Sequence, residues 1–371
     1  MGKGNTLFAH VQARLPWAAF DRAVTQLRGD YKVQRARCRS HVLVLLLAML
    51  RGQHSLRRIE NGLSARQRYL RAFGIGSVDR STVSHANRHR PAEAAETLFQ
   101  GLLTQAQARA MRHGFPFRQK VWTLDATVIQ VSTVLYEWAR CAQDEAGIKL
   151  HVFLDQDGVL PGLVEFGTLK TSELKLARQR LYPPGMVLCF DQGYFDTAWF
   201  RRLTDGSVTF VTRLPPRPRY EVLKERPRDG ASNVLADEVI RFTSNGCRRH
   251  YPRPLRLITF CDAATGHLLW FLTNQMTWSA ETVAAVYKSR WQIELFFKWL
   301  KQHLKLSHLL GRNANAVRWQ VLLALCLYLL LVAFGHQYQV PRSELLWRLN
   351  QYLFDDTTLS KLLKHSYQFQ P

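Results

Sequence analysis

The spacing of apolar residues between positions 119 and 212 constrains the fold most strongly. Helical spacing predicts helices at 172–181 and 196–203. Short apolar or alternating runs predict strands at Gln119–Leu124, Ile148–Leu154, Gly162–Gly167, Met186–Phe190 and Ser207–Thr212. Three strands, a helix, a strand, a helix and a strand form an α/β order, which we expect to build a mixed sheet.

Two aspartates follow the first and the fourth of these strands. Asp125 comes after Leu124, and Asp191 comes after Phe190. A carboxylate at the end of an apolar strand is unfavourable in a core, but it is well placed in a crevice at the edge of a sheet. Two neighbouring carboxylates repel each other unless a cation lies between them. All-oxygen ligands suit Mg²⁺ or Mn²⁺, so we expect a divalent metal site here.

A third acid lies on a helix that we expect to begin after the N-cap Ser279 and to run to about Lys305. At about 100° per residue, its polar side chains share a stripe roughly 60° wide. The stripe contains Tyr287, Arg290, Glu294 and Lys301. A solvated, ion-paired helix face would give the same pattern, so the stripe alone leaves both interpretations open.

The segment before the first strand is predicted to be helical, and we set the limits of this small all-α domain at 1–115. An amphipathic helix at 55–63 is followed by Gly74 and Gly76, which predict a turn. A short basic helix with Ser81 as its expected N-cap comes next. This order is typical of a helix-turn-helix, although an ordinary solvated helix has the same composition. The candidate DNA contacts are Arg80, Ser81, Thr82, His85 and Arg88.

Between the last predicted strand and Ser279 the helical spacing disappears. Strand-like runs at 255–260 and 267–272 predict a β-rich insertion over 214–276, without helices. The fold class is therefore α/β, with the strand order of a ribonuclease-H-like catalytic domain, a β-rich insertion before the third acid and the all-α domain in front. We expect the catalytic domain to occupy 116–213 and 277–340, followed by a helical tail at 341–371.

The charge balance indicates a polyanionic partner. The chain has 51 Lys and Arg against 28 Asp and Glu, a formal net charge of +23. Nucleic acid is the expected partner, while an anionic membrane surface or a ribosome-like partner is not excluded by charge alone. The apolar run Val321–Phe334 is shorter than the ~18 residues that a membrane span needs, so we interpret it as a buried core helix. The six cysteines form no CxxC pair, which favours reduced thiols in the cytoplasm.

The helix stripe and the two aspartate motifs resemble those of a known family. The spacing Y-x2-R-x3-E-x6-K, given by Tyr287, Arg290, Glu294 and Lys301, is similar to the signature of the insertion-sequence-four family of bacterial DDE transposases. Asp125 in Leu-Asp-Ala-Thr and Asp191 in Phe-Asp-Gln-Gly-Tyr-Phe-Asp match its two aspartate motifs. Gln192 departs from the arginine or alanine that is common there. The resemblance covers roughly 5–311.

This resemblance implies a catalytic triad of Asp125, Asp191 and Glu294 that holds two Mg²⁺ or Mn²⁺ ions. It implies hydrolytic nicking at the ends of a mobile element, followed by transesterification into target DNA. Arg290 and Lys301 would hold phosphates, and Tyr287 would contact the DNA backbone or a terminal base. Some members stack a flipped base on an aromatic residue of the insertion, for which Trp270 is the candidate here. A tryptophan in the core of a small sheet is the alternative interpretation.

Other residues favour structural interpretations. The segment Asp155–Gly158 predicts a hairpin turn rather than a calcium loop, because no acid follows at the twelfth loop position. His151 on a strand face is interpreted as a satisfied structural histidine. Asp196 is expected to be the N-cap of the helix that follows it.

The sequence therefore predicts a DNA transposase, a metal-dependent endonuclease and strand-transfer enzyme. We expect it to bind the terminal inverted repeats of its own element and target DNA as a homodimer on paired ends. We expect it in the bacterial cytoplasm, at the nucleoid when bound to DNA, with no membrane partner. The alternatives are another metal-dependent nuclease on the same fold, which would cut without joining, or a silent DNA-binding regulator.

Overall fold

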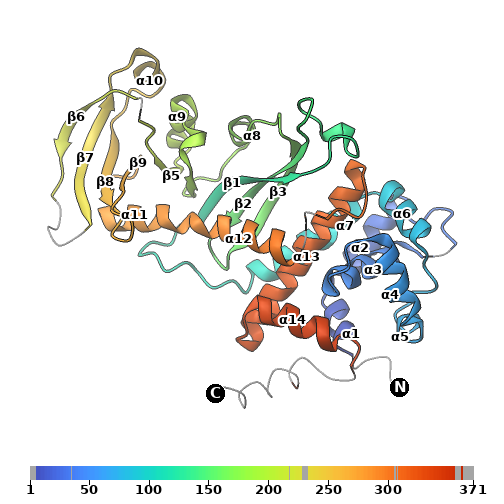
Figure 1. The fold of residues 1–371 in the computed structure, drawn as a ribbon. Coiled ribbons are helices and arrows are strands. Elements are labelled where there is room, and N and C mark those ends of the chain that lie inside the picture. Colours follow the sequence, from blue (N-terminus) through green and yellow to red (C-terminus); the bar gives the residue numbers. More distant parts are fainter. Residues whose placement is uncertain are drawn as a thin grey trace. The chain divides into compact units, whose positions relative to one another are not determined.

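The computed structural model describes residues 6–34, 36–216, 218–227, 233–304, 306, 308–355 and 361 (Figure 1). The chain divides into two compact units. The first unit contains residues 1–109, 129–147 and 298–371, and the second contains 110–128 and 148–297. The predicted helix end at Lys305 and most of the predicted tail after residue 355 lie outside the described residues.

The second unit is built on a nine-stranded sheet with the order β3-β2-β1-β4-β5-β9-β8-β7-β6. β1 pairs with β4, and β4 with β5, in parallel. The pairings of β2 with β3, β5 with β9, and β9 through β8 and β7 to β6 are antiparallel. The sheet is therefore mixed, as expected. The strands are β1 (Val121–Gln130), β2 (Gly147–Asp155), β3 (Leu160–Thr168), β4 (Val187–Phe190), β5 (Thr209–Arg213), β6 (Tyr220–Glu225), β7 (Val234–Phe242), β8 (Leu255–Cys261) and β9 (Leu268–Thr273).

Helices cover both faces of this sheet. On one face, α8 (Glu173–Gln179), α9 (Thr197–Asp205) and α10 (Asn245–His250) pack on a core that includes Phe190 and Trp199. On the other face, α11 (Ala280–Ser289) packs through Val283 and Val286. Alternate residues of β4 point to opposite cores, because successive side chains of a strand lie on opposite faces.

The segment 214–276 is β-rich, as predicted, and its four strands extend the same sheet beyond β5 (Figure 1). β9 pairs antiparallel with β5, and β8, β7 and β6 follow in order. The expectation that this segment contains no helix is wrong, since α10 occupies Asn245–His250. That helix is short, basic and without buried residues, so it lacks the apolar periodicity that predicts a helix.

The described part of the first unit is predominantly helical. Its helices are α1 (Leu7–Ala13), α2 (Trp17–Gln26), α3 (Cys38–Leu50), α4 (Leu56–Ser64), α5 (Gln67–Arg71), α6 (Arg80–His89), α7 (Glu93–Gln107), α13 (Ala314–Tyr338) and α14 (Arg342–Tyr352), with α12 (Trp291–His303) ending within its limits. The amino-terminal helices thus share one unit with α13 and α14. The sequence instead predicts these two helices in the second part of the catalytic domain, 277–340, and in the tail, 341–371.

Helix α13 is the centre of this unit. It packs against α7, α3 and α14, and the Trp319 indole N–H donates to the Arg90 carbonyl oxygen over 2.9 Å. By length and composition alone it is long and apolar enough to cross a membrane, but 83% of its apolar stretch is buried inside the protein. This burial agrees with the interpretation of Val321–Phe334 as part of a core helix.

Helix α6 begins two residues earlier than predicted. Asp79 is the N-cap, and its carboxylate accepts from the Thr82 backbone N–H over 2.7 Å. The prediction of Ser81 as N-cap is therefore wrong; its hydroxyl lies inside the helix and donates to Asp79 over 2.6 Å. A carboxylate stabilises a helix N-terminus through the unpaired backbone N–H groups and the helix dipole, which explains the earlier start.

Candidate active site

Asp125 and Asp191 lie side by side on neighbouring parallel strands. The pairing of β1 with β4 ends at Leu124 opposite Phe190, and each aspartate is the next residue. The prediction that the first strand ends before Asp125 is wrong, because β1 continues to Gln130. Beyond Leu124 the chain stays extended beside β2, where the Val131 N–H donates to the Ala146 carbonyl oxygen over 3.1 Å.

The backbone after β4 holds Asp191 in place. The Asp191 carboxylate accepts from the Gly193 N–H over 2.6 Å, which caps the short 3₁₀ turn Gln192–Tyr194. The Thr212 hydroxyl on β5 donates to the Asp191 carbonyl oxygen over 3.1 Å. A turn and a neighbouring strand thus restrain this aspartate on both sides.

Glu294 and Arg290 come from the junction between α11 and α12. Arg290 is the C-cap of α11 with helical backbone angles, so the two helices follow each other almost without a break. Its guanidinium forms ion pairs with Asp125, Nη1 to Oδ2 over 3.4 Å, and with Glu294. One guanidinium therefore connects the acid of the helix with an acid of the sheet.

Tyr287, in the last turn of α11, packs beside this junction. Its side chain is buried, and its ring packs against Phe271 with 4.7 Å between ring centroids. The Arg290 guanidinium lies 5.8 Å from the centre of the Tyr287 ring. Burial raises the pKa of Tyr287 to about 12, so its phenol is protonated at neutral pH. Lys301 lies further along α12 and is exposed.

The electrostatics of the site are those of a partly dehydrated acid cluster. Burial raises the pKa of Asp125 to about 6. The Ala126 N–H and the Arg290 charge act to lower this pKa, whereas the negative charges of Asp191 and Glu173 act to raise it. Burial acts to lower the pKa of Arg290, but Tyr287, Glu294 and Asp125 outweigh burial and raise it. Arg290 is therefore charged, and its positive charge compensates Asp125 and Glu294.

The donor set suits a hard divalent cation. Asp125 and Glu294 already share one positive charge, that of Arg290, and Asp191 adjoins Asp125 in register. Among the described residues, no three His, Cys, Asp or Glu side chains are already close enough to hold a metal ion. The carboxylates thus fit Mg²⁺ or Mn²⁺ in chemistry, and they require Arg290 to give up its ion pairs when a cation enters.

The structure places three further polar residues beside Asp125, two of which, Glu173 and Tyr194, sequence reasoning missed. His151, Glu173 and Tyr194 line one small cavity together with Asp125. Glu173 forms an ion pair with Lys149 over 3.2 Å. Burial raises the pKa of the Tyr194 phenol, and the nearby Glu173 adds to this rise. Glu173 is an ordinary acid in the first turn of α8, so its sequence context gave no signal of its place beside Asp125.

His151 differs from its expected role as a satisfied structural histidine. The ring is buried on β2, but its Nε2 has no hydrogen-bond partner among the described residues. Burial lowers the pKa of His151, so the ring is neutral at pH 7. The expected hairpin turn at Asp155–Gly158 is confirmed, since it joins β2 to β3 with Gly158 at a φ of +75°. Asp196 caps α9 by accepting from the Trp199 N–H over 2.6 Å, as predicted.

The remaining predicted DNA contacts are at the surface. On α6, Arg80, Ser81, His85 and Arg88 are exposed and Thr82 is half-buried. Trp270 on β9 is 40% exposed, so its interpretation as a core residue is wrong. It lies opposite Thr259 in the pairing of β9 with β8.

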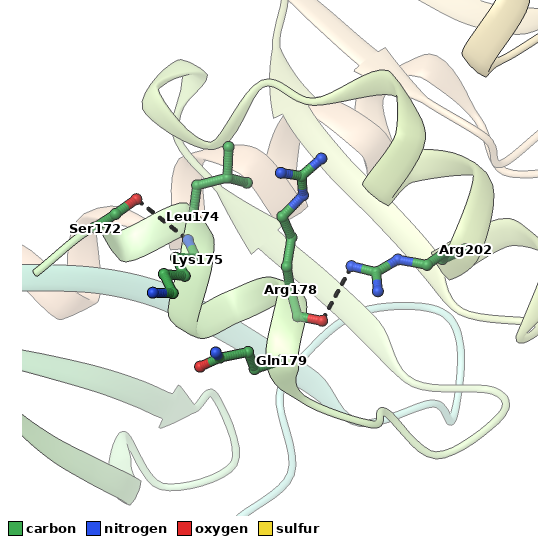
Figure 2. Close-up of a pocket in the computed structure, with 6 residues that line it drawn as sticks. All are labelled: Ser172, Leu174, Lys175, Arg178, Gln179 and Arg202. Atoms are coloured by element: carbon green, nitrogen blue, oxygen red, sulfur yellow. Dashed lines mark hydrogen bonds between the residues drawn. The ribbon is translucent and has the colours of Figure 1, made fainter.

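A basic hollow of about 370 Å³ lies between α8 and α9 (Figure 2). Lys175 and Arg178 project from α8, and the Arg202 guanidinium of α9 donates to the Arg178 carbonyl oxygen over 3.0 Å. Arg178 also pairs with Asp196 over 2.7 Å. Part of the charge excess of the chain is thus concentrated on the surface of the second unit.

Comparison with known proteins identifies the family of this chain. A family model described as a transposase DDE domain matches residues 116–330. The chain belongs to the DDE transposases. Such a transposase is an enzyme that cleaves DNA and transfers strands. Membership implies a ribonuclease-H-like fold and the use of divalent metal ions, in keeping with the mixed sheet and the acid cluster. A second model, a domain of unknown function (DUF4372), matches residues 3–76.

The relatives of this transposase are bacterial. A protein of Sinorhizobium fredii described as a transposase is 33% identical over 67% of this chain and 69% of its own length. A transposase for insertion sequence element IS5377 of Geobacillus stearothermophilus is 29% identical over 70% of this chain and 68% of its own length. A transposase for element IS4SA of Synechocystis is 25% identical over 69% of this chain and 71% of its own length. The predicted relation to the insertion-sequence-four family is thereby confirmed.

Proposed function

We propose that this transposase binds the terminal inverted repeats of its own element, cleaves the DNA at their ends and joins the freed ends to target DNA. We further propose that it acts as a homodimer on paired ends, in the bacterial cytoplasm at the nucleoid. The observation that carries the proposal is the ion-paired link from Glu294 through Arg290 to Asp125, with Asp191 next to Asp125 in register.

Asp125, Asp191 and Glu294 are the proposed metal ligands, and two Mg²⁺ or Mn²⁺ ions are the proposed cofactors. When bound, the ions supply Lewis-acid activation of the attacking oxygen and stabilisation of the leaving oxygen. Arg290, once released from the carboxylates, is placed to bind a phosphate oxygen of the scissile strand. Lys301 on the same helix is the second proposed phosphate contact. Tyr287, whose ring lies beside the Arg290 guanidinium, is the proposed contact to the DNA backbone or to a terminal base.

We also propose that α6 contacts the inverted repeat through its exposed side chains, and that Trp270 meets DNA with its exposed ring. The test of the whole function uses the purified chain with Mn²⁺, a labelled duplex ending in the inverted repeat that flanks the gene, and a supercoiled target. Joined products with the repeat duplex, and none with a scrambled duplex, are the expected result. Cleavage without joining would identify a nuclease instead, and binding without cleavage a regulator.

Replacing Arg80 by alanine tests the role of α6. Arg80 is exposed, and its backbone N–H, which alanine retains, donates to Glu60 over 3.1 Å. If the side chain contacts phosphate, affinity should fall and the slope of log K against log salt should decrease by about one. Fluorescence anisotropy from low to high salt gives both values. An unchanged salt slope would remove Arg80 from the interface.

The raised pKa of Asp125 predicts a pH dependence of metal binding. In the metal-free protein this carboxyl, with a pKa of about 6, is mostly protonated at pH 5, so an entering cation must displace its proton. The affinity for Mn²⁺ should therefore increase about tenfold per pH unit below pH 6 and level off above it. Calorimetry in buffers of different ionisation enthalpy measures both the affinity and the proton released. A constant affinity from pH 5 to pH 8 would contradict the prediction.

A further inference from the structure

The first unit contains a groove of about 980 Å³ that none of the proposed roles uses. Four segments form its walls: residues 54–56 at the start of α4, residues 84–88 of α6, residues 134–138 of the loop after β1, and residues 309–316, which lead into α13. The groove contains an aromatic and apolar wall on the loop side and basic residues on the helix side. All of its lining residues belong to the same unit.

Hydrogen bonds to the backbone connect these walls. The Trp138 indole N–H donates to the Arg312 carbonyl oxygen over 2.7 Å, and the Tyr136 hydroxyl donates to the Gly311 carbonyl oxygen over 3.3 Å. The Asn315 side-chain amide donates to the Asn87 carbonyl oxygen over 2.9 Å, which joins α13 to α6. These hydrogen bonds hold the segments that line the groove in fixed positions relative to one another.

Three large apolar side chains of the loop are exposed. Val134 is 78% exposed, Leu135 43% and Trp138 39%. All three line the groove. An apolar surface that is concave, exposed and framed by polar residues is typical of a binding site.

The charge of the groove favours an anionic occupant. Arg88 and Arg312 line it, are exposed, and have no ion-pair partner among the residues that the structure describes. Glu137 is the acid among the lining residues, against these two guanidinium groups and His54. An aromatic wall beside two arginines matches a nucleotide, whose base has a planar apolar face and whose phosphates are anionic.

We propose that this groove binds one unpaired nucleotide of the DNA, with its base stacked on Trp138 and its phosphates held by Arg88 and Arg312. The proposal rests on the proposed binding of the inverted repeats, which brings DNA to the first unit. This site differs from Trp270, which lies on β9 of the second unit.

The test is cross-linking of 5-iodouracil, which reacts with an aromatic ring stacked on it. The full chain without divalent metal is bound to inverted-repeat duplexes that carry 5-iodouracil at successive positions near the end, irradiated, and mapped by mass spectrometry. One position should cross-link to Trp138. Trp138→Phe keeps a ring and should keep the cross-link, whereas Trp138→Ala should lose it.

The same variants are compared in affinity for a duplex with a single unpaired thymine. Trp138→Ala should bind it about tenfold more weakly, and Trp138→Phe should stay near the parent. Trp347→Ala removes an exposed tryptophan of α14 in the same unit and should change neither readout. If Trp138→Phe is as defective as Trp138→Ala, the indole hydrogen bond to Arg312 matters and stacking does not, which overturns the proposal.

The outcomes separate this proposal from the proposed function. Repeat-specific cleavage and joining without any cross-link in the loop would overturn the nucleotide site and leave the function standing. A cross-link at Trp138 that forms equally with a scrambled duplex would support the site and count against recognition of the inverted repeats. Absence of DNA binding under all conditions would overturn both.

Discussion

Replacing Glu294 by glutamine is expected to lower strand cleavage by about a thousandfold, because it removes the charge of one proposed metal ligand while keeping its shape. A loss of this size corresponds to about 4 kcal/mol of transition-state stabilisation, within the range of metal-dependent charge stabilisation. Arg290 can still hydrogen bond to the amide oxygen, so the helix junction should stay folded. The measurement is single-turnover cleavage of a labelled inverted-repeat duplex at saturating Mn²⁺.

The matched control is Glu281→Gln. Glu281 is an exposed acid in the first turn of α11, so the substitution changes the net charge equally at a site remote from Arg290 in sequence. Its cleavage rate should stay within twofold of the parent, and both variants should bind the repeat duplex as the parent does. Cleavage by Glu294→Gln at the parental rate would remove Glu294 from the site, and Asp125→Asn and Asp191→Asn extend the same test to the strands.

Most of the elements that carry this site could be predicted from local sequence. Apolar periodicity placed β2, β4, α9 and the N-cap Ser279 within a few residues of their observed positions. The strand-end positions of Asp125 and Asp191 predicted that the two carboxylates are neighbours, but not the pairing of Leu124 with Phe190 that brings them side by side. That register is decided by packing between segments far apart in the chain, which local sequence does not show.

Two features escaped prediction for different physical reasons. Helix α13 is apolar on nearly all sides, so it has no polar face to indicate which helices it packs against, and its place among the amino-terminal helices could not be foreseen. Glu173 and Tyr194 gave no signal, because single polar residues beside an N-cap or inside a turn are common in any surface segment. Their proximity to Asp125 appears only when α8 packs on the sheet.

Replacing Arg290 by glutamine is expected to separate metal binding from catalysis. In the metal-free protein Arg290 compensates Asp125 and Glu294, so a cation must compete with its guanidinium. Without that competitor, Mn²⁺ should bind about tenfold more tightly, since each displaced partial ion pair is worth roughly 1 kcal/mol at a half-buried position. The cleavage rate at saturating Mn²⁺ should nevertheless fall about a hundredfold, because the phosphate contact proposed for Arg290 is lost. Calorimetry and single-turnover cleavage measure the two effects.

Arg290→Lys distinguishes charge from geometry. Lysine keeps the positive charge, but it lacks the planar guanidinium that pairs with two carboxylates at once. It should therefore compete with the metal less than arginine does, and the Mn²⁺ affinity should lie between those of the parent and Arg290→Gln. Lys298→Gln, an exposed change of the same charge on α12, should leave both affinity and rate unchanged. If Arg290→Gln binds Mn²⁺ more weakly than the parent, the guanidinium does not compete with the metal, and its ion pairs position the carboxylates for the cation instead.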